Sequence, residues 1–170
     1  MKKILSLSLI SFLMLSCNCK KNVAQENKDR IAQILSSCTE DFECTLEVIP
    51  NKTMNVKTGD VSGTYFELED FNGTKVYHYT YNQKTDKQYQ DAGYREEIIF
   101  ELTSDITDLK LSNEELQKTK LIFGVWCYCK GKAGNYKLTK GNFSKKGNEI
   151  WIDFPAVVED QKVTELKIKI

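Results

Sequence analysis

Cysteines carry most of the chemistry that the types and spacing of residues in this sequence allow. Four of the six cysteines follow the N-terminal region: Cys38, Cys44, Cys127 and Cys129. In an oxidising compartment such cysteines pair as disulfides. As thiolates converging on one strand face, they would bind a soft metal such as zinc or copper.

Strand geometry narrows the disulfide pairing. Cys127 and Cys129 lie on a predicted strand, where residues two apart share a face but have Cα atoms ~6.5 to 7 Å apart. That separation is at or past the limit for an unstrained bridge. We therefore expect Cys127 and Cys129 each to bond to one of Cys38 and Cys44, with the choice of partner open. A bridge that closes such a long loop would stabilise the fold by about 4 to 5 kcal/mol.

The alternative is a thiol or soft-metal protein in which Cys127 and Cys129 act with Cys38, Cys44 or His78. The C-x-C spacing argues against it, because zinc sites and redox pairs favour C-x2-C. His78 is the only histidine, which leaves little support for a histidine-based metal site. We expect neither a metal nor a cofactor.

Aromatic residues form a second group of candidates. Six could line a pocket for an apolar ligand or a platform for sugar rings: Tyr77, Tyr79, Tyr81, Trp126, Tyr128 and Trp151. Strand alternation puts the first three tyrosines on one face and His78 on the other. Core packing and cross-strand pairing explain the same residues without a ligand, and this is the favoured interpretation.

The sequence does not predict an enzyme, and we expect no catalytic residue. A Ser-His-Asp site would have to use His78, and no Gly-x-Ser-x-Gly turn accompanies it. Glu96 and Glu97 are consecutive, so on a strand they point to opposite faces and make a poor acid–base pair. Phosphate loops and dinucleotide fingerprints are absent from the sequence.

The first seventeen residues have the pattern of a targeting signal. Two lysines precede an uncharged apolar run from Ile4 to Leu15, which is signal-peptide anatomy. As a helix the run would cover roughly 18 Å, short of the ~30 Å hydrocarbon core of a membrane. It ends Leu13-Met14-Leu15-Ser16-Cys17, which resembles the lipobox of bacterial lipoproteins.

That resemblance covers residues 1–17 alone and implies cleavage after residue 16, with a diacylglycerol on Cys17. Two acyl chains would make attachment to a membrane stable. Residues 17–28, which include Cys19, would form a lipidated N-terminus and a polar tether. We expect an envelope protein anchored through its lipid, facing the periplasm from the outer membrane.

Charge and length limit the roles open to the rest of the chain. The chain has 24 basic and 24 acidic residues, so it offers no basic surface for nucleic acid. Residues 29–170 suffice for a single β-rich domain with one core. We expect its partner to be a small apolar or glycan ligand, or another envelope protein.

The elements that position these residues are mainly strands. An apolar set in Val23–Ser37 fits one face of an N-terminal helix. After Cys38, short runs rich in β-branched and aromatic residues alternate with turn signals. The predicted strands cover 43–49, 64–69, 75–81, 94–102, 120–130, 136–139, 142–144, 149–154 and 163–170.

Two local motifs complete the prediction. Asn72-Gly73 favours a type I′ hairpin between neighbouring strands, and Ser112 with Glu115 forms a capping-box pattern that predicts a short helix over 112–118. Short connections make neighbouring strands antiparallel. We therefore expect a mainly β meander that closes into a barrel, resembling a lipocalin-like cup, or forms a two-sheet sandwich.

Overall fold

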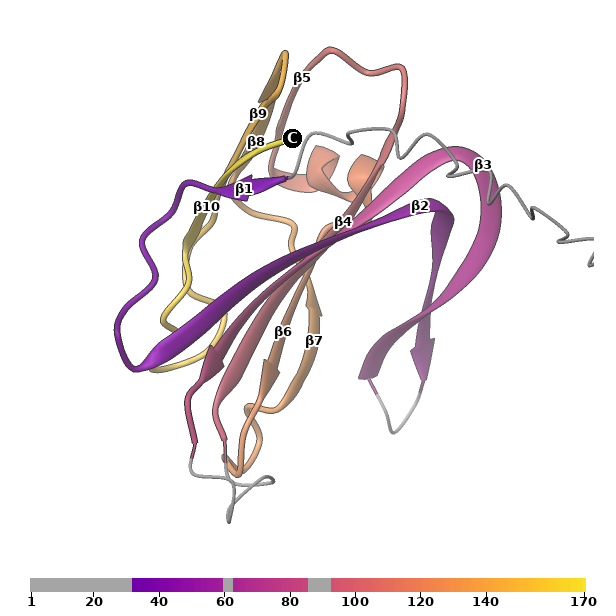
Figure 1. The fold of residues 1–170 in the computed structure, drawn as a ribbon. Coiled ribbons are helices and arrows are strands. Elements are labelled where there is room, and N and C mark those ends of the chain that lie inside the picture. The colour runs from indigo at the N-terminus through magenta and orange to yellow at the C-terminus, as the bar shows by residue number, and fades with distance from the viewer. Residues whose placement is uncertain (1–31, 60–62, 86–92) are drawn as a thin grey trace, which may run out of the picture.

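The computed structural model describes residues 32–59, 63–85 and 93–170, and within them the fold is mainly β, as predicted (Figure 1). The predicted signal peptide, Cys17, Cys19 and the tether lie outside the described residues. Within the described part, no helix is long and apolar enough to cross a membrane.

Ten strands form two antiparallel sheets. The first sheet has the spatial order β1 (Gln33–Ile34), β10 (Glu165–Lys169), β9 (Glu149–Asp153), β8 (Asn142–Lys146) and β5 (Asp108–Ser112). The second has the order β2 (Phe42–Gly59), β3 (Gly63–Gln83), β4 (Arg95–Thr103), β6 (Ile122–Trp126) and β7 (Gly134–Lys137). A short 3-10 helix, η2 (Asn113–Thr119), joins β5 to β6.

The second sheet closes on itself because β3 is long enough to reach β7. Thr64, near the start of β3, pairs with Asn135 of β7. Strands β3, β4, β6 and β7 thus make a closed four-stranded barrel, with β2 added alongside β3. The first sheet packs against the outside of this barrel (Figure 1). The fold therefore combines both predicted architectures: it is a sandwich in which one layer is a barrel.

Two apolar clusters fill the fold. The main core lies between the layers, where Phe100 of β4 stacks on Tyr77 with ring centroids 4.9 Å apart and meets Phe143 of β8 edge-on at 5.3 Å. A smaller cluster fills part of the barrel interior and consists of Met54, Val76, Ile99 and Ile122. Because side chains alternate along a strand, β3, β4 and β6 supply residues to both clusters.

The predicted hairpin at Asn72-Gly73 is wrong. β3 continues through this dipeptide, and β2 pairs with both halves of it. Pro50 pairs with Lys75 and Lys52 pairs with Asp70, so residues 71–74 of β3 bulge opposite Asn51 alone. Gly73 has a φ of 87°, and a bulge needs such a positive φ as much as a tight turn does. The bulge bends both strands, and their far ends curl over (Figure 1).

The two predicted helices differ in outcome. The N-terminal one lies mostly outside the described residues, and its described end is not helical, because Gln33 and Ile34 form β1. Ile34 packs toward the core between exposed neighbours, which is the alternation of a strand. The short helix is present as η2. The predicted capping box is not formed at Ser112, whose side chain makes no cap bond.

Candidate functional site

The four cysteines of the domain form two local disulfides, Cys38–Cys44 and Cys127–Cys129. The predicted cross-pairing is therefore wrong. β6 ends at Trp126, and the chain then bends instead of continuing as a strand. The bend brings the Cα atoms of Cys127 and Cys129 to 5.2 Å, inside the range for a disulfide.

The short loops change what these bridges contribute. Their sequence separations are 6 and 2 residues, for which the chain-entropy model gives only about 2 kcal/mol and about 1 kcal/mol. With all four sulfurs paired, these cysteines present no thiolate to a metal. Across 32–59, 63–85 and 93–170, no group of three His, Cys, Asp or Glu side chains could hold a metal ion.

The six candidate aromatic residues do not come together. The three tyrosines of β3 are buried between the layers, opposite to His78, which confirms the predicted faces. Burial raises the pKa of Tyr79 to about 12. Trp126 lies on the barrel side of β6. Trp151, on the first sheet, is 41% exposed, and Tyr128, between the bridged cysteines, is 87% exposed.

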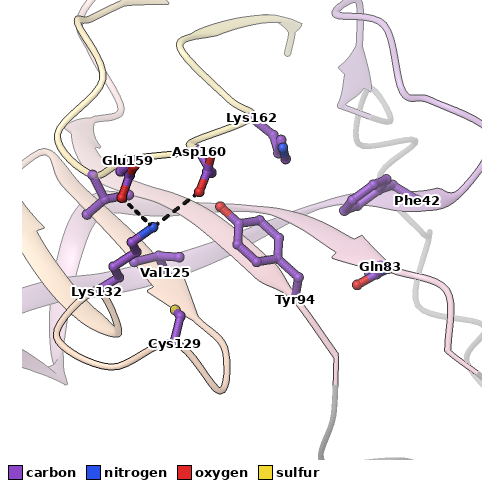
Figure 2. Close-up of a pocket in the computed structure, with 10 residues that line it drawn as sticks. Phe42, Gln83, Tyr94, Val125, Cys129, Lys132, Glu159, Asp160 and Lys162 are labelled. Atoms are coloured by element: carbon purple, nitrogen blue, oxygen red, sulfur yellow. Dashed lines mark hydrogen bonds and ion pairs between the residues drawn. The ribbon is translucent and has the colours of Figure 1, made fainter.

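A cleft opens at the end of the interlayer space, where β4 begins and β6 ends (Figure 2). Its volume of about 420 Å³ falls within the range of small-molecule pockets. The apolar part of its lining comes from Phe42, Tyr94, Val125 and Val158. The polar part comes from Gln83, Lys132, Glu159, Asp160 and Lys162. Cys129 also lines the cleft.

Core residues behind the apolar wall of the cleft support it. Phe42 stacks on the buried Tyr81 with ring centroids 4.1 Å apart and an interplanar angle of 17°. Tyr81 is fixed in turn by a 2.8 Å hydrogen bond between its hydroxyl and that of Thr39. Val125 belongs to the main core. These contacts make the wall part of the core packing and so preform it.

The buried carboxylate of Glu96 holds the 154–164 connection, the outer loop of the cleft, against β4. Glu96 is fully buried and accepts hydrogen bonds from the hydroxyl of Tyr94 and, at 2.6 Å each, from the backbone N–H groups of Lys162 and Val163. Burial, and the hydrogen bond to Glu96, raise the pKa of Tyr94, so its hydroxyl stays protonated and donates. One side chain thus joins β4 to the 154–164 connection that forms the opposite wall.

The rim is held more weakly than the wall. Lys132 Nζ lies 3.0 Å from the Glu159 carboxylate and 3.2 Å from that of Asp160, which links the turn after β6 to the 154–164 connection (Figure 2). These hydrogen bonds raise the pKa of Lys132. Both acidic side chains are largely exposed, and such surface pairs are worth about 0–1 kcal/mol at the median. The ion pairs of the rim therefore contribute little to holding the two sides of the cleft together, whereas the hydrogen bonds of Glu96 contribute more.

Sequence patterns pointed to little of this cleft. Of the residues that line the cleft, the sequence predicts a role only for Cys129, and it predicts a disulfide to Cys38 or Cys44 instead of the one observed with Cys127. One signal was available: Glu96 shares its strand face with Tyr94, Ile98 and Phe100, so it is a single carboxylate on an apolar face. An acid in that position must find hydrogen-bond donors within the fold.

No protein-family model, no curated protein and no solved structure matches this chain. The function proposed for this chain therefore depends on the sequence and on the geometry of the cleft.

Proposed function

We propose that this chain is a lipid-anchored protein of the bacterial cell envelope whose β-domain binds a small amphipathic ligand in the interlayer cleft. The observation that carries the proposal is a preformed cleft of about 420 Å³ with an apolar wall backed by the main core. Ligand sites of this kind pair an apolar lining with a few polar groups that orient the ligand.

The polar groups around the cleft favour binding over catalysis. Glu96 is committed to three donors, and the Tyr94 hydroxyl is one of them. Lys132 is engaged by two carboxylates. Lys162 makes no ion pair with any residue that the structure describes, and it lies at the opposite end of the rim from Lys132 (Figure 2). It is the group that would orient the polar end of a ligand.

The lipobox-like residues that end at Cys17 support the anchor. A tethered binding domain is consistent with a nearly neutral surface, because membrane attachment then depends on the lipid rather than on basic residues.

Filling the cleft tests ligand binding. Val158, half-buried in the cleft wall, is replaced by tryptophan, and the exposed neighbour Val157, which does not line the cleft, provides the matched control Val157→Trp. Anilinonaphthalene sulfonate is the probe, and organic extracts of the purified proteins are compared by mass spectrometry. We expect Val158→Trp alone to lose probe binding and any co-purified molecule. Equal binding by both variants would contradict the proposal.

Cys17→Ser tests the anchor, with Cys19→Ser as its control. We expect the first variant to lose palmitate labelling and to appear as a soluble domain or an uncleaved precursor, and the second to behave as the wild type. A processed, membrane-bound and palmitate-labelled Cys17→Ser protein would disprove the lipid site.

A further inference from the structure

The barrel interior changes character along its length. The apolar cluster of Met54, Val76, Ile99 and Ile122 fills one part of it. Toward the end where β4 begins and β6 ends, the inward positions are polar and include His78, Glu97 and Trp126. These residues form a polar barrel mouth on the face of the second sheet that points away from the cleft.

Glu97 organises this barrel mouth. Its side chain is only 9% exposed, and its carboxylate meets Arg95 Nε of its own strand at 2.9 Å and Trp126 Nε1 of β6 at 3.1 Å. His78 Nε2 lies 3.5 Å away. The guanidinium of Arg95 also lies 5.8 Å from the centre of the Trp126 ring. The indole, which is 37% exposed, is therefore held in one orientation at the surface.

Gly124 allows three polar groups to come close together beside that carboxylate. It pairs with Glu97 on one side and with Asn135 on the other. A Cβ at this position would lie 2.9 Å from Asn135 Oδ1, 3.3 Å from Trp126 Nε1 and 3.4 Å from Glu97 Oε2. Any larger residue would crowd three polar groups that the glycine lets converge.

Two of the surrounding polar atoms, His78 Nε2 and Asn135 Oδ1, are buried and make no hydrogen bond within the described part of the chain. His78 Nε2 has the longer ion-pair contact of 3.5 Å with Glu97. Folded proteins leave few buried polar atoms unpaired, because each costs about 1 to 3 kcal/mol. The barrel mouth thus has hydrogen-bonding capacity that the described residues do not use.

Charge selects the class of ligand. Arg95 already neutralises Glu97, so a cationic ligand would gain little and would meet the guanidinium. An anionic ligand would face the carboxylate of Glu97 and the amide oxygen of Asn135. A neutral ligand with several hydroxyl or amide donors suits the acceptors, and the exposed indole suits a ring with an apolar face. Sugar rings combine these properties.

We propose that the barrel mouth binds a neutral sugar ring, which stacks on Trp126 and donates hydrogen bonds to Glu97 and Asn135. This site is separate from the cleft, because Glu96 and Glu97 point to opposite faces of β4. Sugar binding at the barrel mouth can therefore succeed or fail independently of ligand binding in the cleft.

The chain provides its own matched reporters, because it has two tryptophans. Trp151 is 41% exposed with Lys167 Nζ 5.6 Å from its ring centre, which closely parallels Trp126 and Arg95. Trp151→Phe and Trp126→Phe are each titrated with the trimer of N-acetylglucosamine. We expect a saturable fluorescence change in Trp151→Phe and none in Trp126→Phe. A signal confined to Trp126→Phe, or no signal in either, would overturn the proposal.

Two further comparisons test the chemistry. The glucosamine trimer, a cation with the same ring, and the galacturonate trimer, an anion, should each bind at least about tenfold more weakly than the neutral trimer. Equal or tighter binding of either charged trimer would refute the assignment. Val158→Trp, which blocks the cleft, should leave sugar binding unchanged.

Gly124→Ala tests whether the three polar groups must stay close together. In a variant whose circular dichroism matches the wild type, we expect at least about tenfold weaker binding of the neutral trimer, because the new methyl group pushes the Asn135 amide and the Trp126 indole away from the positions that the sugar contacts. Unchanged binding would overturn the role of Gly124. If this variant does not fold, the NMR signal of the Trp126 indole N–H in Trp151→Phe tests the proposal instead. We expect the neutral trimer to shift this signal, and an unshifted signal would refute the proposal.

Discussion

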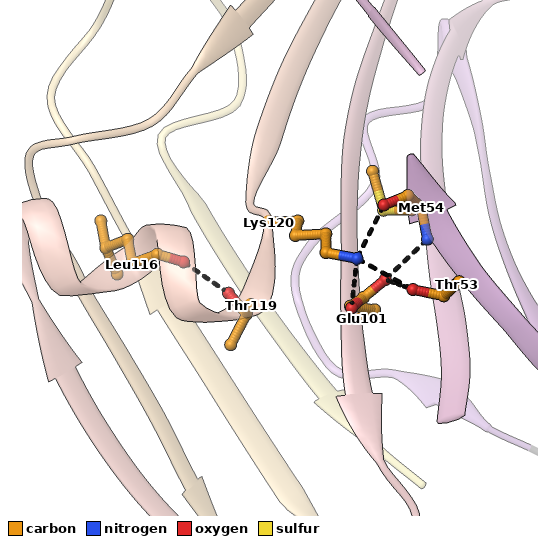
Figure 3. Close-up of polar contacts among 6 residues, drawn as sticks. All are labelled: Thr53, Met54, Glu101, Leu116, Thr119 and Lys120. Atoms are coloured by element: carbon orange, nitrogen blue, oxygen red, sulfur yellow. Dashed lines mark hydrogen bonds and ion pairs between the residues drawn. The ribbon is translucent and has the colours of Figure 1, made fainter. Parts of the chain in front are cut away.

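The ammonium of Lys120 lies 2.9 Å from the carboxylate of Glu101, and both groups also bond to β2 just beyond its bend (Figure 3). Lys120 Nζ donates to the Met54 carbonyl at 2.7 Å and to the Thr53 hydroxyl at 2.9 Å. Glu101 accepts from the Met54 N–H at 2.7 Å and from the same hydroxyl at 2.9 Å. These bonds connect β2, β4 and the residue that follows η2, at the point where β2 and β3 begin to curl over the barrel.

We predict that Lys120→Met destabilises the fold by about 1 to 3 kcal/mol, because the largely buried Glu101 loses its cation and the Met54 carbonyl loses a donor. Urea unfolding measures the change. Lys118→Met, two residues from Lys120, is the control: it breaks an exposed pair with Glu115 and should cost less than about 1 kcal/mol. Equal losses in both variants would mean that Lys120 does not secure the bend.

Glu96 should be the most sensitive residue of the cleft. We predict that Glu96→Gln destabilises the fold by about 2 to 4 kcal/mol, because an amide cannot accept all three hydrogen bonds and is left with unpaired buried donors. Thermal unfolding measures stability, and hydrogen exchange at Lys162 and Val163 measures release of the outer loop. Glu159→Gln, at the exposed rim, should change neither. Slow exchange at both amides in Glu96→Gln would argue against the anchoring role.

The disulfide pairing can be determined from one tryptic digest. Cys38 and Cys44 fall in a single peptide, residues 31–52, and Cys127 and Cys129 in another, residues 121–130. Without reduction we expect two separate peptides, each lighter by two hydrogens than its reduced form. If a cross-linked species containing both peptides dominated, the cross-pairing predicted from strand spacing would be correct instead.

Acid should weaken the barrel mouth. Burial alone would raise the pKa of Glu97, but His78, Trp126 and Arg95 stabilise the carboxylate, and the net pKa lies below the ordinary value of 4.5. A lowered carboxyl pKa adds stability above the unfolded-state pKa, and that stability is lost as the pH falls through the folded-state pKa.

Unfolding free energies measured from about pH 6 to pH 3 should therefore fall less steeply in Glu97→Gln than in the wild type. Glu114→Gln, which removes an exposed carboxyl in the first turn of η2, is the control and should follow the wild-type curve. Parallel curves for the wild type and Glu97→Gln would show that the carboxylate gains no stability from its three neighbours.

Alternation along strands made much of this fold predictable. It placed Tyr77, Tyr79 and Tyr81 opposite to His78, and Glu96 opposite to Glu97, as the structure confirms. Alternation is a local property that survives whichever strands become neighbours. The mainly β class and the short helix near residue 113 depended on equally local patterns.

The errors arose where distant or irregular segments decide the outcome. Closure of the barrel depends on Thr64 meeting Asn135, a contact with no local signature. Asn72-Gly73 suits a bulge as well as a tight turn. Pairing of β2 with both halves of β3 makes this dipeptide part of a bulge. The cleft needs the aperiodic 154–164 connection as its second wall, so strand patterns could not reveal it.

Strand β4 is a wall shared by two compartments, since Glu96 holds the cleft on one side and Glu97 the barrel mouth on the other. One peptide bond joins these residues, so a ligand that displaces β4 from either side also moves the other carboxylate. Thermodynamic linkage makes such an effect reciprocal: whatever factor occupancy of the cleft imposes on affinity at the barrel mouth, occupancy of the mouth imposes on the cleft. If both proposed sites bind their ligands, any coupling between them would pass through this single strand, without a hinge or a second subunit.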